Sequence, residues 1–292
     1  MLQFMKRRFK NVLVVCRRNN PNSVATLMSL IQYLKKERCK VFTDRDTLKF
    51  LPQELGIPTV PLGKIRSCCE LIAVVGGDGS FLSAARLAAV KHIPVIGVSR
   101  GGLGFLTDIA PDSMQKVGEI LTGSFYQEKR PLLKVKLTNE AAQILAVNDV
   151  VMLSNTIGHI IEFSLYLNGN FLCKYRADGL TVATPTGSTA HALSGGGPII
   201  HPDAKNILLV PMLSHNLSSR PLVIDSGASV EIKFEESNHT QLVVIFDGQN
   251  RTILSKGNKI KITKARENLI LLHPKDYNYL DILRTKLHWE RE

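Results

Sequence analysis

The feature that most constrains the fold is a short apolar segment followed by a glycine-rich turn and a helix-forming segment. Residues 71–75 (Leu-Ile-Ala-Val-Val) are an unbroken apolar run, which is typical of a parallel strand buried on both faces. Gly76-Gly77-Asp78-Gly79 follows, and residues 81–90 then carry good helix formers with apolar positions at helical spacing. The sequence therefore predicts a strand, a glycine turn and a helix.

This turn combines two chemical properties. Glycines let a phosphate group approach the backbone, and the N–H groups at the start of a helix point at such an anion. The Asp78 carboxylate repels phosphate, so we expect it to hold a hydroxyl group or accept its proton. Together they indicate phosphoryl transfer to an alcohol. The alternative is a turn without chemistry, because Asp-Gly is common in hairpins, but the helix-forming residues that follow argue against a hairpin.

Residues 1–130 are expected to form an α/β domain with a parallel, Rossmann-like sheet. Strands alternate with helices, which indicates a parallel sheet covered on both faces; further strands are predicted at 12–16, 40–43 and 94–98, and helices from 24 to about 38 and at 114–121. A second glycine-rich loop, 99–106, follows the strand at 94–98 and should face the same crevice as Asp78. Phe105 in this loop is either a core residue or a ring for a nucleotide base.

Residues 131–274 are expected to form an all-β, antiparallel, sandwich-like domain. Apolar and polar residues alternate there, as in sheets with one buried face, and Asn168-Gly169 and Asp247-Gly248 predict hairpin turns. Residues 275–292 return to helical spacing, and we expect a helix there that packs back on the first domain.

Two polar segments stand out in the second half. Asn148 and Asp149 interrupt an apolar run, and adjacent strand residues point to opposite faces, so one of them should point inward or at a ligand. The alternative is a solvated edge strand. The second segment, 184–198, is rich in hydroxyl residues and glycine and poor in charge, which fits recognition of amide and phosphate groups or a plain surface loop.

The amino-acid composition limits the kinds of partner that we expect the protein to bind. The chain has 292 residues, enough for two domains, and its net charge of +12 indicates acidic partners such as nucleotides or a basic surface that aids solubility. Nucleic-acid binding is not expected, because no base-reading motif occurs. Five cysteines without a CxxC pair favour reduced thiols and a cytoplasmic location, and no apolar run approaches the ~20 residues of a membrane span. His201-Pro-Asp203 is either a metal-site fragment or a loop, and no metal-binding residues are predicted.

Six motifs occur in one order and together resemble the bacterial NAD kinases, from about Val12 to Trp289. They are Gly76-Gly-Asp-Gly79, Arg100-Gly-Gly-Leu-Gly-Phe-Leu-Thr-Asp108, Asn148-Asp-Val-Val151, Asp178-Gly-Leu180, Thr184-Pro-Thr-Gly-Ser-Thr-Ala190 and His273-Pro-Lys-Asp276. The first motif alone is shared with diacylglycerol, sphingosine and 6-phosphofructo-kinases. The run from Thr184 to Ala190 is much more specific.

The resemblance implies transfer of the γ-phosphoryl group of ATP, or of polyphosphate, to the 2′-hydroxyl of the adenosine ribose of NAD, giving NADP. It implies that Asp78 is the proton acceptor with Gly79 beside it, that Phe105 packs near the adenine, and that Asn148 and Asp149 contact the adenine and the ribose hydroxyls. Further implied binding residues are His159, Arg176, Asp178, Thr189, Ala190, His191, Ala192, Leu193, Ser194 and Gln249. It also implies Mg2+ carried by the nucleotide, and a homo-oligomer, a dimer or tetramer, with sites built from two subunits.

The chain departs from the family pattern at two positions. Family members commonly carry Glu in place of Asp149 and Tyr in place of His191, which adds a group that can be charged near pH 6–7. Two other functions remain as alternatives. One is a lipid or sugar kinase that shares only the first motif, and the other is a non-catalytic dinucleotide sensor, against which the intact Asp78 argues.

Overall fold

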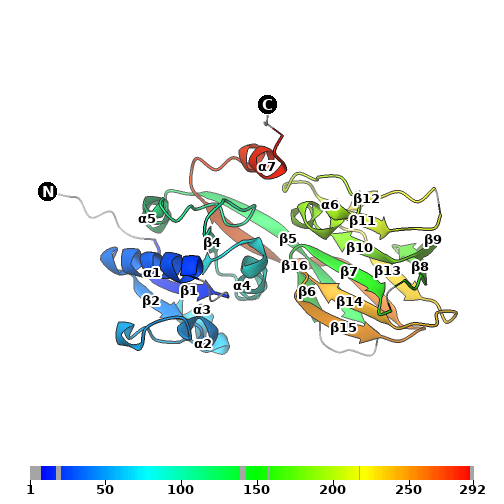
Figure 1. Ribbon diagram of the computed structural model, residues 1–292, viewed down its shortest axis with the longest axis horizontal. Coiled ribbons are helices and arrows are strands. Elements are labelled where there is room, and N and C mark those ends of the chain that lie inside the picture. The colour runs from blue at the N-terminus through cyan, green and yellow to red at the C-terminus, as the bar shows by residue number, and fades with distance from the viewer. Residues whose placement is uncertain (1–7, 18–20, 139–142, 157, 217, 290–292) are drawn as a thin grey trace. The chain divides into compact units, whose positions relative to one another are not determined.

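The structure is a computed structural model that describes residues 8–17, 21–138, 143–156, 158–216 and 218–289 (Figure 1). The chain divides into two compact units, Met1–Lys129 with Leu269–Glu292, and Arg130–Asn268. Strands β5 (Tyr126–Leu137) and β16 (Lys259–His273) contribute residues to both. Residues 1–7 and 290–292, at the ends of the expected first domain, lie outside the described residues.

The first unit is built on a parallel sheet in the order β2-β1-β3-β4, which the end of β16 extends through the pair Leu271 and Val95. Its strands are β1 (Asn11–Cys16), β2 (Lys40–Thr43), β3 (Leu71–Val75) and β4 (Val95–Val98). Its α-helices are α1 (Pro21–Lys36), α2 (Arg45–Leu48), α3 (Ile65–Cys68), α4 (Asp78–Lys91), α5 (Met114–Thr122) and α7 (Tyr279–Leu287), with two 3-10 turns, η1 (Gln53–Leu55) and η2 (Leu62–Lys64).

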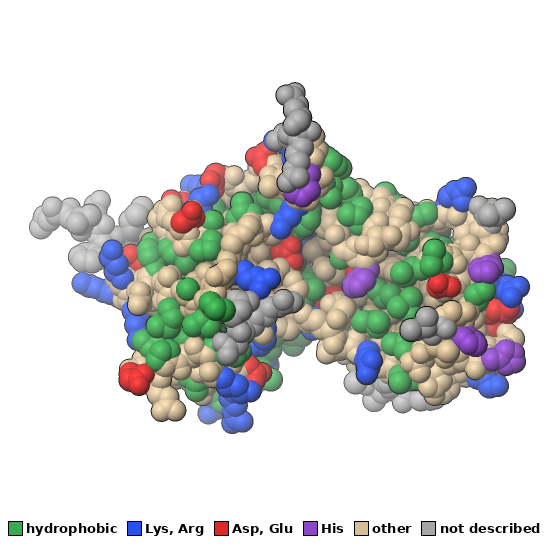
Figure 2. Space-filling model, in the orientation of Figure 1, with side chains coloured by type: hydrophobic (Ala, Val, Ile, Leu, Met, Phe, Trp, Pro, Cys, Tyr) green, Lys and Arg blue, Asp and Glu red, His purple; other side chains and the backbone are tan. Residues whose placement is uncertain are grey.

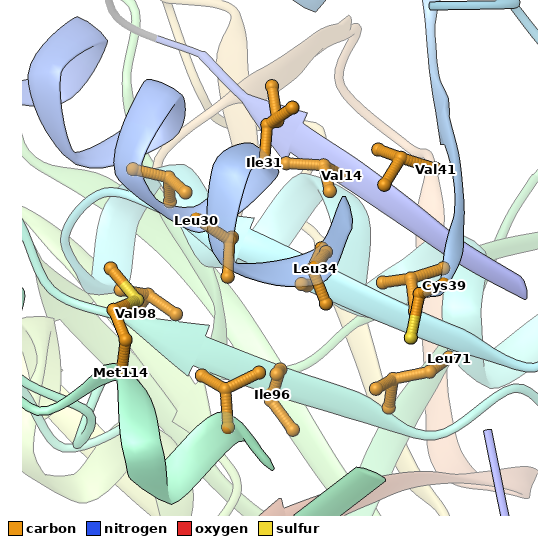
Figure 3. Packing of buried hydrophobic residues seen from close by; sticks show 14 of the residues in the cluster. Val14, Leu30, Ile31, Leu34, Cys39, Val41, Leu71, Ile96, Val98 and Met114 are labelled. Atoms are coloured by element: carbon orange, nitrogen blue, oxygen red, sulfur yellow. The ribbon is translucent and has the colours of Figure 1, made fainter. Parts of the chain in front are cut away.

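The predicted strand, glycine turn and helix are confirmed. All five residues of β3 are buried, Gly77 lies at the N-terminal boundary of α4, and α4 begins at Asp78, so the hairpin alternative is wrong. Figure 3 shows how one face of the sheet packs: Leu30, Ile31 and Leu34 of α1 lie among side chains of the strands. This packing holds the carboxyl end of β3, where the glycine turn starts, in a fixed place.

The predicted C-terminal helix is also confirmed, as α7. Asn278 accepts a hydrogen bond from the N–H of Leu280 and so caps the helix, and Ile282 and Leu283 are buried. The Tyr279 ring lies 6.2 Å from the ring of Phe105, centroid to centroid. Phe105 is half-buried, so part of its surface packs within the unit.

The second unit contains two antiparallel sheets. One has the order β12-β11-β10-β7-β14-β15, and the other includes β5 with β6 and the first part of β16 with β13, β8 and β9. The strands are β6 (Gln143–Ala146), β7 (Asp149–Ser154), β8 (Ile161–Leu167), β9 (Asn170–Ala177), β10 (Gly179–Ala183), β11 (Asn206–Met212), β12 (Leu222–Asp225), β13 (Val230–Phe234), β14 (Leu242–Phe246) and β15 (Asn250–Leu254). A 3-10 turn, η3 (Thr186–Thr189), and a short helix, α6 (His191–Ser194), follow β10.

Apolar residues from both sheets form one core in this unit, as expected for a sandwich. In β13 and β14 every second residue is buried, which matches the alternation of the sequence. Both predicted hairpin turns are confirmed, with positive φ angles of 51° and 83° at Asn168 and Gly169, and of 52° and 64° at Asp247 and Gly248.

The distribution of charge and the character of the helices both bear on function. On the face that Figure 2 shows, lysine and arginine side chains form small separate groups, several of them beside acidic side chains. None of the helices in the described ranges has the length and apolar character that a membrane span requires.

Candidate functional site

In the first unit, the Asp78 carboxylate is fixed by the second glycine-rich loop. Its oxygens accept hydrogen bonds from the backbone N–H groups of Phe105 and Leu106, at 2.9 and 3.0 Å, and from the Thr107 hydroxyl at 3.3 Å. The side chain is half-buried, and Gly79 beside it is exposed. The two glycine-rich loops are thus in direct contact. A carboxylate held by two amides keeps one orientation toward a reacting hydroxyl.

Gly104 makes this contact possible. A Cβ atom at Gly104 would lie 2.3 Å from Asp78 Oδ1 and 2.5 Å from Thr107 Oγ1, closer than any real side chain can approach. The glycine therefore serves the close approach of the loop backbone to the carboxylate.

Asp108, which directly follows this loop, belongs to a buried group of three ionisable side chains. His273 Nδ1 lies 2.8 Å from Asp108 Oδ2, and His273 Nε2 lies 3.2 Å from Glu128 Oε2. The Tyr277 ring stacks on the imidazole at 3.8 Å between centroids. Burial alone would lower the pKa of His273, but its hydrogen bonds to the two carboxylates raise that pKa above its ordinary value. The imidazole, which contacts both carboxylates, ties the end of β16 to the loop that holds Asp78.

In the second unit, Asp149 begins a central strand. β7 pairs with β10 on one side and with β14 on the other, so the edge-strand alternative is wrong. Asp149 is fully buried, and Asn148 is half-buried. Asp149 Oδ1 and Asn148 Oδ1 are buried atoms with no hydrogen-bond partner among the residues that the structure describes. An unpaired buried oxygen costs about 1–3 kcal/mol, so both atoms fit a ligand that supplies donors.

Asp247 fixes the backbone of this segment. Its carboxylate accepts hydrogen bonds from the N–H groups of Val147, Asn148 and Asp149, at 3.1, 2.7 and 3.3 Å. The sequence indicated only a hairpin turn for Asp247, because nothing in a single sequence relates this residue to a strand about a hundred positions earlier.

The hydroxyl-rich segment from 184 is folded, not an open loop. Thr184 Oγ1 donates to the Val147 carbonyl at 2.6 Å, and Ser188 Oγ donates to the Pro185 carbonyl at 2.7 Å, so these hydroxyls stabilise the segment itself. A Cβ atom at Gly187 would lie 2.1 Å from the Asn148 carbonyl oxygen, so this glycine lets η3 pack directly against Asn148. Of the predicted binding residues in η3 and α6, Ala192 is buried, Thr189, Ala190 and Leu193 are half-buried, and His191 and Ser194 are exposed.

His191 lies beside Asp149. Its Nδ1 atom is 3.3 Å from Asp149 Oδ2, while 53% of the His191 side chain is exposed. The hydrogen bond to Asp149 raises the pKa of His191, and partial burial opposes this rise. The structure therefore brings together Asn148, Asp149 and His191, and the Asp247 carboxylate binds the backbone of the segment that carries the first two.

Three other predicted binding residues lie elsewhere in this unit. Asp149 pairs with Ala183 at one end of β10, whereas Asp178 precedes β10 at its other end, about 17 Å along the strand. Arg176 lies beside Asp178 in the chain and pairs with Glu162 at 3.2 Å, and the exposed His159 lies in the connection between β7 and β8. Gln249 is exposed in the turn after Asp247.

No metal cage is evident. Within the described ranges, no group of three or more His, Cys, Asp or Glu side chains is arranged to hold a metal ion. His201 Nδ1 instead lies 3.6 Å from Asp203 Oδ2 on the surface, and it accepts a hydrogen bond from the Asp203 N–H.

Comparison with solved structures identifies the fold. The fold is that of the NAD(H) kinases: the crystal structure of a yeast NADH kinase complexed with NADH matches 97% of this chain and 88% of that chain, with a TM-score of 0.86 and 23% identity. An NAD kinase from Archaeoglobus fulgidus in complex with ATP matches 95% of this chain and 98% of that chain, with a TM-score of 0.74 and 24% identity.

The sequences define the family. The models for the ATP-NAD kinase N-terminal and C-terminal domains match residues 12–128 and 147–273. The NAD kinase of Legionella pneumophila strain Paris is 44% identical over 98% of both chains. The chain belongs to the ATP-NAD kinase family.

Proposed function

We propose that the protein transfers the γ-phosphoryl group of ATP to the 2′-hydroxyl of the adenosine ribose of NAD, producing NADP. Membership of the ATP-NAD kinase family over nearly the whole chain gives the reaction. The observation that carries the assignment is Asp78, at the start of a helix after a glycine turn and fixed by the amides of Phe105 and Leu106.

Asp78 is the residue that would orient and deprotonate the acceptor hydroxyl. An ordinary carboxylate is a weak base for an alcohol, but a loose phosphoryl-transfer transition state needs little early proton transfer. Positioning then contributes most of the rate enhancement, and the three hydrogen bonds to Asp78 supply it before the substrate arrives.

Asn148 and Asp149 would bind the adenosine part of the dinucleotide. Asn148 Oδ1 can accept from an amine and Asp149 Oδ1 from a ribose hydroxyl, which would satisfy both unpaired atoms. Phe105, with one part of its surface against Tyr279, would place its remaining surface near the base.

The proposal includes a divalent metal, Mg2+, carried by the phosphates of ATP. A single carboxylate such as Asp78 is a ligand of the kind that Mg2+ uses when it enters with a nucleotide. The ion would neutralise charge on the transferred phosphoryl group. A cytoplasmic location also belongs to the proposal, because all five cysteines are free thiols.

A homo-oligomer completes the proposal. The separation of Asp149 from Asp178 along β10 suggests that a second copy of the chain supplies the cluster of His159, Arg176 and Asp178 to a binding site. Mixing two inactive variants tests this. Asp149→Asn and Asp178→Asn proteins, refolded or co-expressed together, should regain part of the activity if sites are shared. Mixtures as inactive as the parents would argue that each chain works alone.

The reaction is tested with the purified protein, NAD, ATP and Mg2+, and NADP is measured with an NADP-specific dehydrogenase. A second series replaces ATP with polyphosphate. NADP formation supports the proposal. Tight dinucleotide binding without turnover would favour the sensor, and phosphorylation of a lipid or sugar with NAD left unchanged would favour the other kinase class.

A further inference from the structure

We propose that His191 acts through Asp149 as a positioning residue that couples dinucleotide binding to the uptake of a proton. The inference rests on the proposed function, since the ligand is the ribose hydroxyl of NAD at Asp149. It follows from how the side chains of His191 and Asp149 meet.

The first step concerns the charge of Asp149. The carboxylate is fully buried, and within the described part of the chain only one of its oxygens, Oδ2, has a partner, the Nδ1 atom of His191 at 3.3 Å. A buried carboxylate is stable only when it is paired. The protonated imidazole supplies that pairing and leaves Oδ1 to accept a hydroxyl group.

The second step concerns what faces the imidazole. Asp149 faces it from β7, and the turn between β14 and β15 approaches it from another side, because a Cβ atom at Gly248 would lie 3.3 Å from His191 Cε1. That turn carries the Asp247 carboxylate, which is bound by three amides. Among the described elements, η3 (Thr186–Thr189), β10 (Gly179–Ala183) and β11 (Asn206–Met212) also pack against α6, and the sequences of these three contain no ionisable side chain. Two carboxylates and no second cation among these elements favour the charged imidazole.

The third step concerns the ligand. More than half of the His191 side chain is exposed, so in the free protein water screens the attraction between the imidazolium and the Asp149 carboxylate. A dinucleotide on Asp149 would exclude this water and bring a negatively charged pyrophosphate near the ring. Exclusion of water strengthens the attraction between the imidazolium and Asp149 but also desolvates the charged ring, and we infer that the added negative charge of the pyrophosphate makes the attraction the larger effect. The complex should therefore hold the proton on His191 at a higher pH than the free protein does.

Thermodynamic linkage gives the direction in which the affinity for NAD changes with pH. Because the liganded protein binds the proton more tightly, NAD binds more tightly to the protonated protein. Affinity should be highest below the pKa of His191 in the free protein, fall as the pH rises through the interval between the free and the liganded pKa, and then level off. A difference of one pKa unit corresponds to about tenfold in affinity.

The closing experiment measures NAD binding by titration calorimetry from pH 5.5 to 8.5, in two buffers of different ionisation enthalpy, which counts the protons taken up. The wild type should take up a fraction of one proton near pH 7, and its dissociation constant should rise by about three- to tenfold across the range. His191→Tyr should bind NAD without proton uptake and without this pH dependence. His239→Gln is the matched control, because His239 is exposed in the loop between β13 and β14 of the same unit, and it should behave like the wild type.

A second measurement needs no ligand. The His191 imidazole is titrated by NMR in the wild type and in Asp149→Asn, where the raised pKa should return toward its ordinary value. An unchanged His191 titration in Asp149→Asn, or equal proton uptake in His191→Tyr and the wild type, would overturn the inference while the proposed function stood. A protein that binds no NAD at any pH would overturn both.

Discussion

His273 Nδ1 lies 2.8 Å from Asp108 Oδ2, and both side chains are buried. Asp108 directly follows the three residues that donate hydrogen bonds to Asp78. The imidazole also contacts Glu128 on its other nitrogen. A single residue near the end of the chain thus fixes the loop that orients the candidate catalytic carboxylate.

The first prediction concerns the pH dependence of stability. The pKa of His273 is raised in the folded protein, so its stabilising contribution is complete below its ordinary pKa of about 6.5 and is lost as the pH rises through the raised value. His273→Gln should lower the free energy of unfolding by about 3 kcal/mol at pH 6 and by less at pH 9. Urea unfolding at both pH values measures this, with His239→Gln as the control. An equal loss at both pH values would show that His273 is neutral.

The second prediction concerns the Asp78 carboxylate. Asp78→Asn replaces one accepting oxygen by an N–H donor that faces the N–H of Phe105 or Leu106. We expect NADP formation to fall by about a hundredfold or more, the scale of a lost acid–base group. Initial rates at saturating NAD and ATP measure this, and circular dichroism checks the fold. Activity within a few-fold of the wild type would remove Asp78 from the mechanism.

The third prediction separates two glycines of the same loop. Gly104→Ala places a Cβ atom against Asp78 Oδ1, so the carboxylate must move, and we expect kcat to fall at least tenfold. Gly102→Ala is the matched control, because no atom lies within 4 Å of a Cβ at that position. Equal activities of the two variants would mean that the position of Asp78 is not critical.

The fourth prediction concerns Asp247 in the second unit. Asp247→Asn weakens three hydrogen bonds to the segment 147–149, so we expect a loss of about 1–3 kcal/mol in stability and a KM for NAD raised about tenfold with a smaller change in kcat. Asp225→Asn is the control, since Asp225 Oδ1 accepts a hydrogen bond from the N–H of Gly227 within its own exposed turn. A change in kcat alone would place Asp247 in the chemistry rather than in binding.

Local patterns predicted much of the fold. The buried run of β3, the helical spacing of α5 and the Asn168-Gly169 turn each act over a few residues, so the sequence contains the whole signal. The residue at which the C-terminal segment rejoins the first unit is harder to predict from the sequence. The segment begins at Leu269 because the end of β16 joins β4, and an alternating pattern does not show where a strand changes partner.

The sequence predicted the candidate site residues that lie within a motif. It did not predict the residues whose contribution depends on partners far away in the chain. Asp78 stands out because it is a carboxylate within a glycine turn, and Asn148 and Asp149 stand out because they interrupt an apolar run. Asp247 and the contact of His273 with Asp108 depend on pairs about a hundred or more positions apart. No propensity or spacing relates such pairs, and only the tertiary fold brings them together.

The place of β16 in the chain has a consequence for synthesis. Leu271 provides the partner of Val95, and His273 contacts Asp108, yet His273 is synthesised 165 residues after Asp108. Contacts this distant in sequence form slowly, because a long loop must close first. A nascent chain that extends only to Asn268 contains the whole Asp78 turn, but its Asp108 does not yet have the contact with His273.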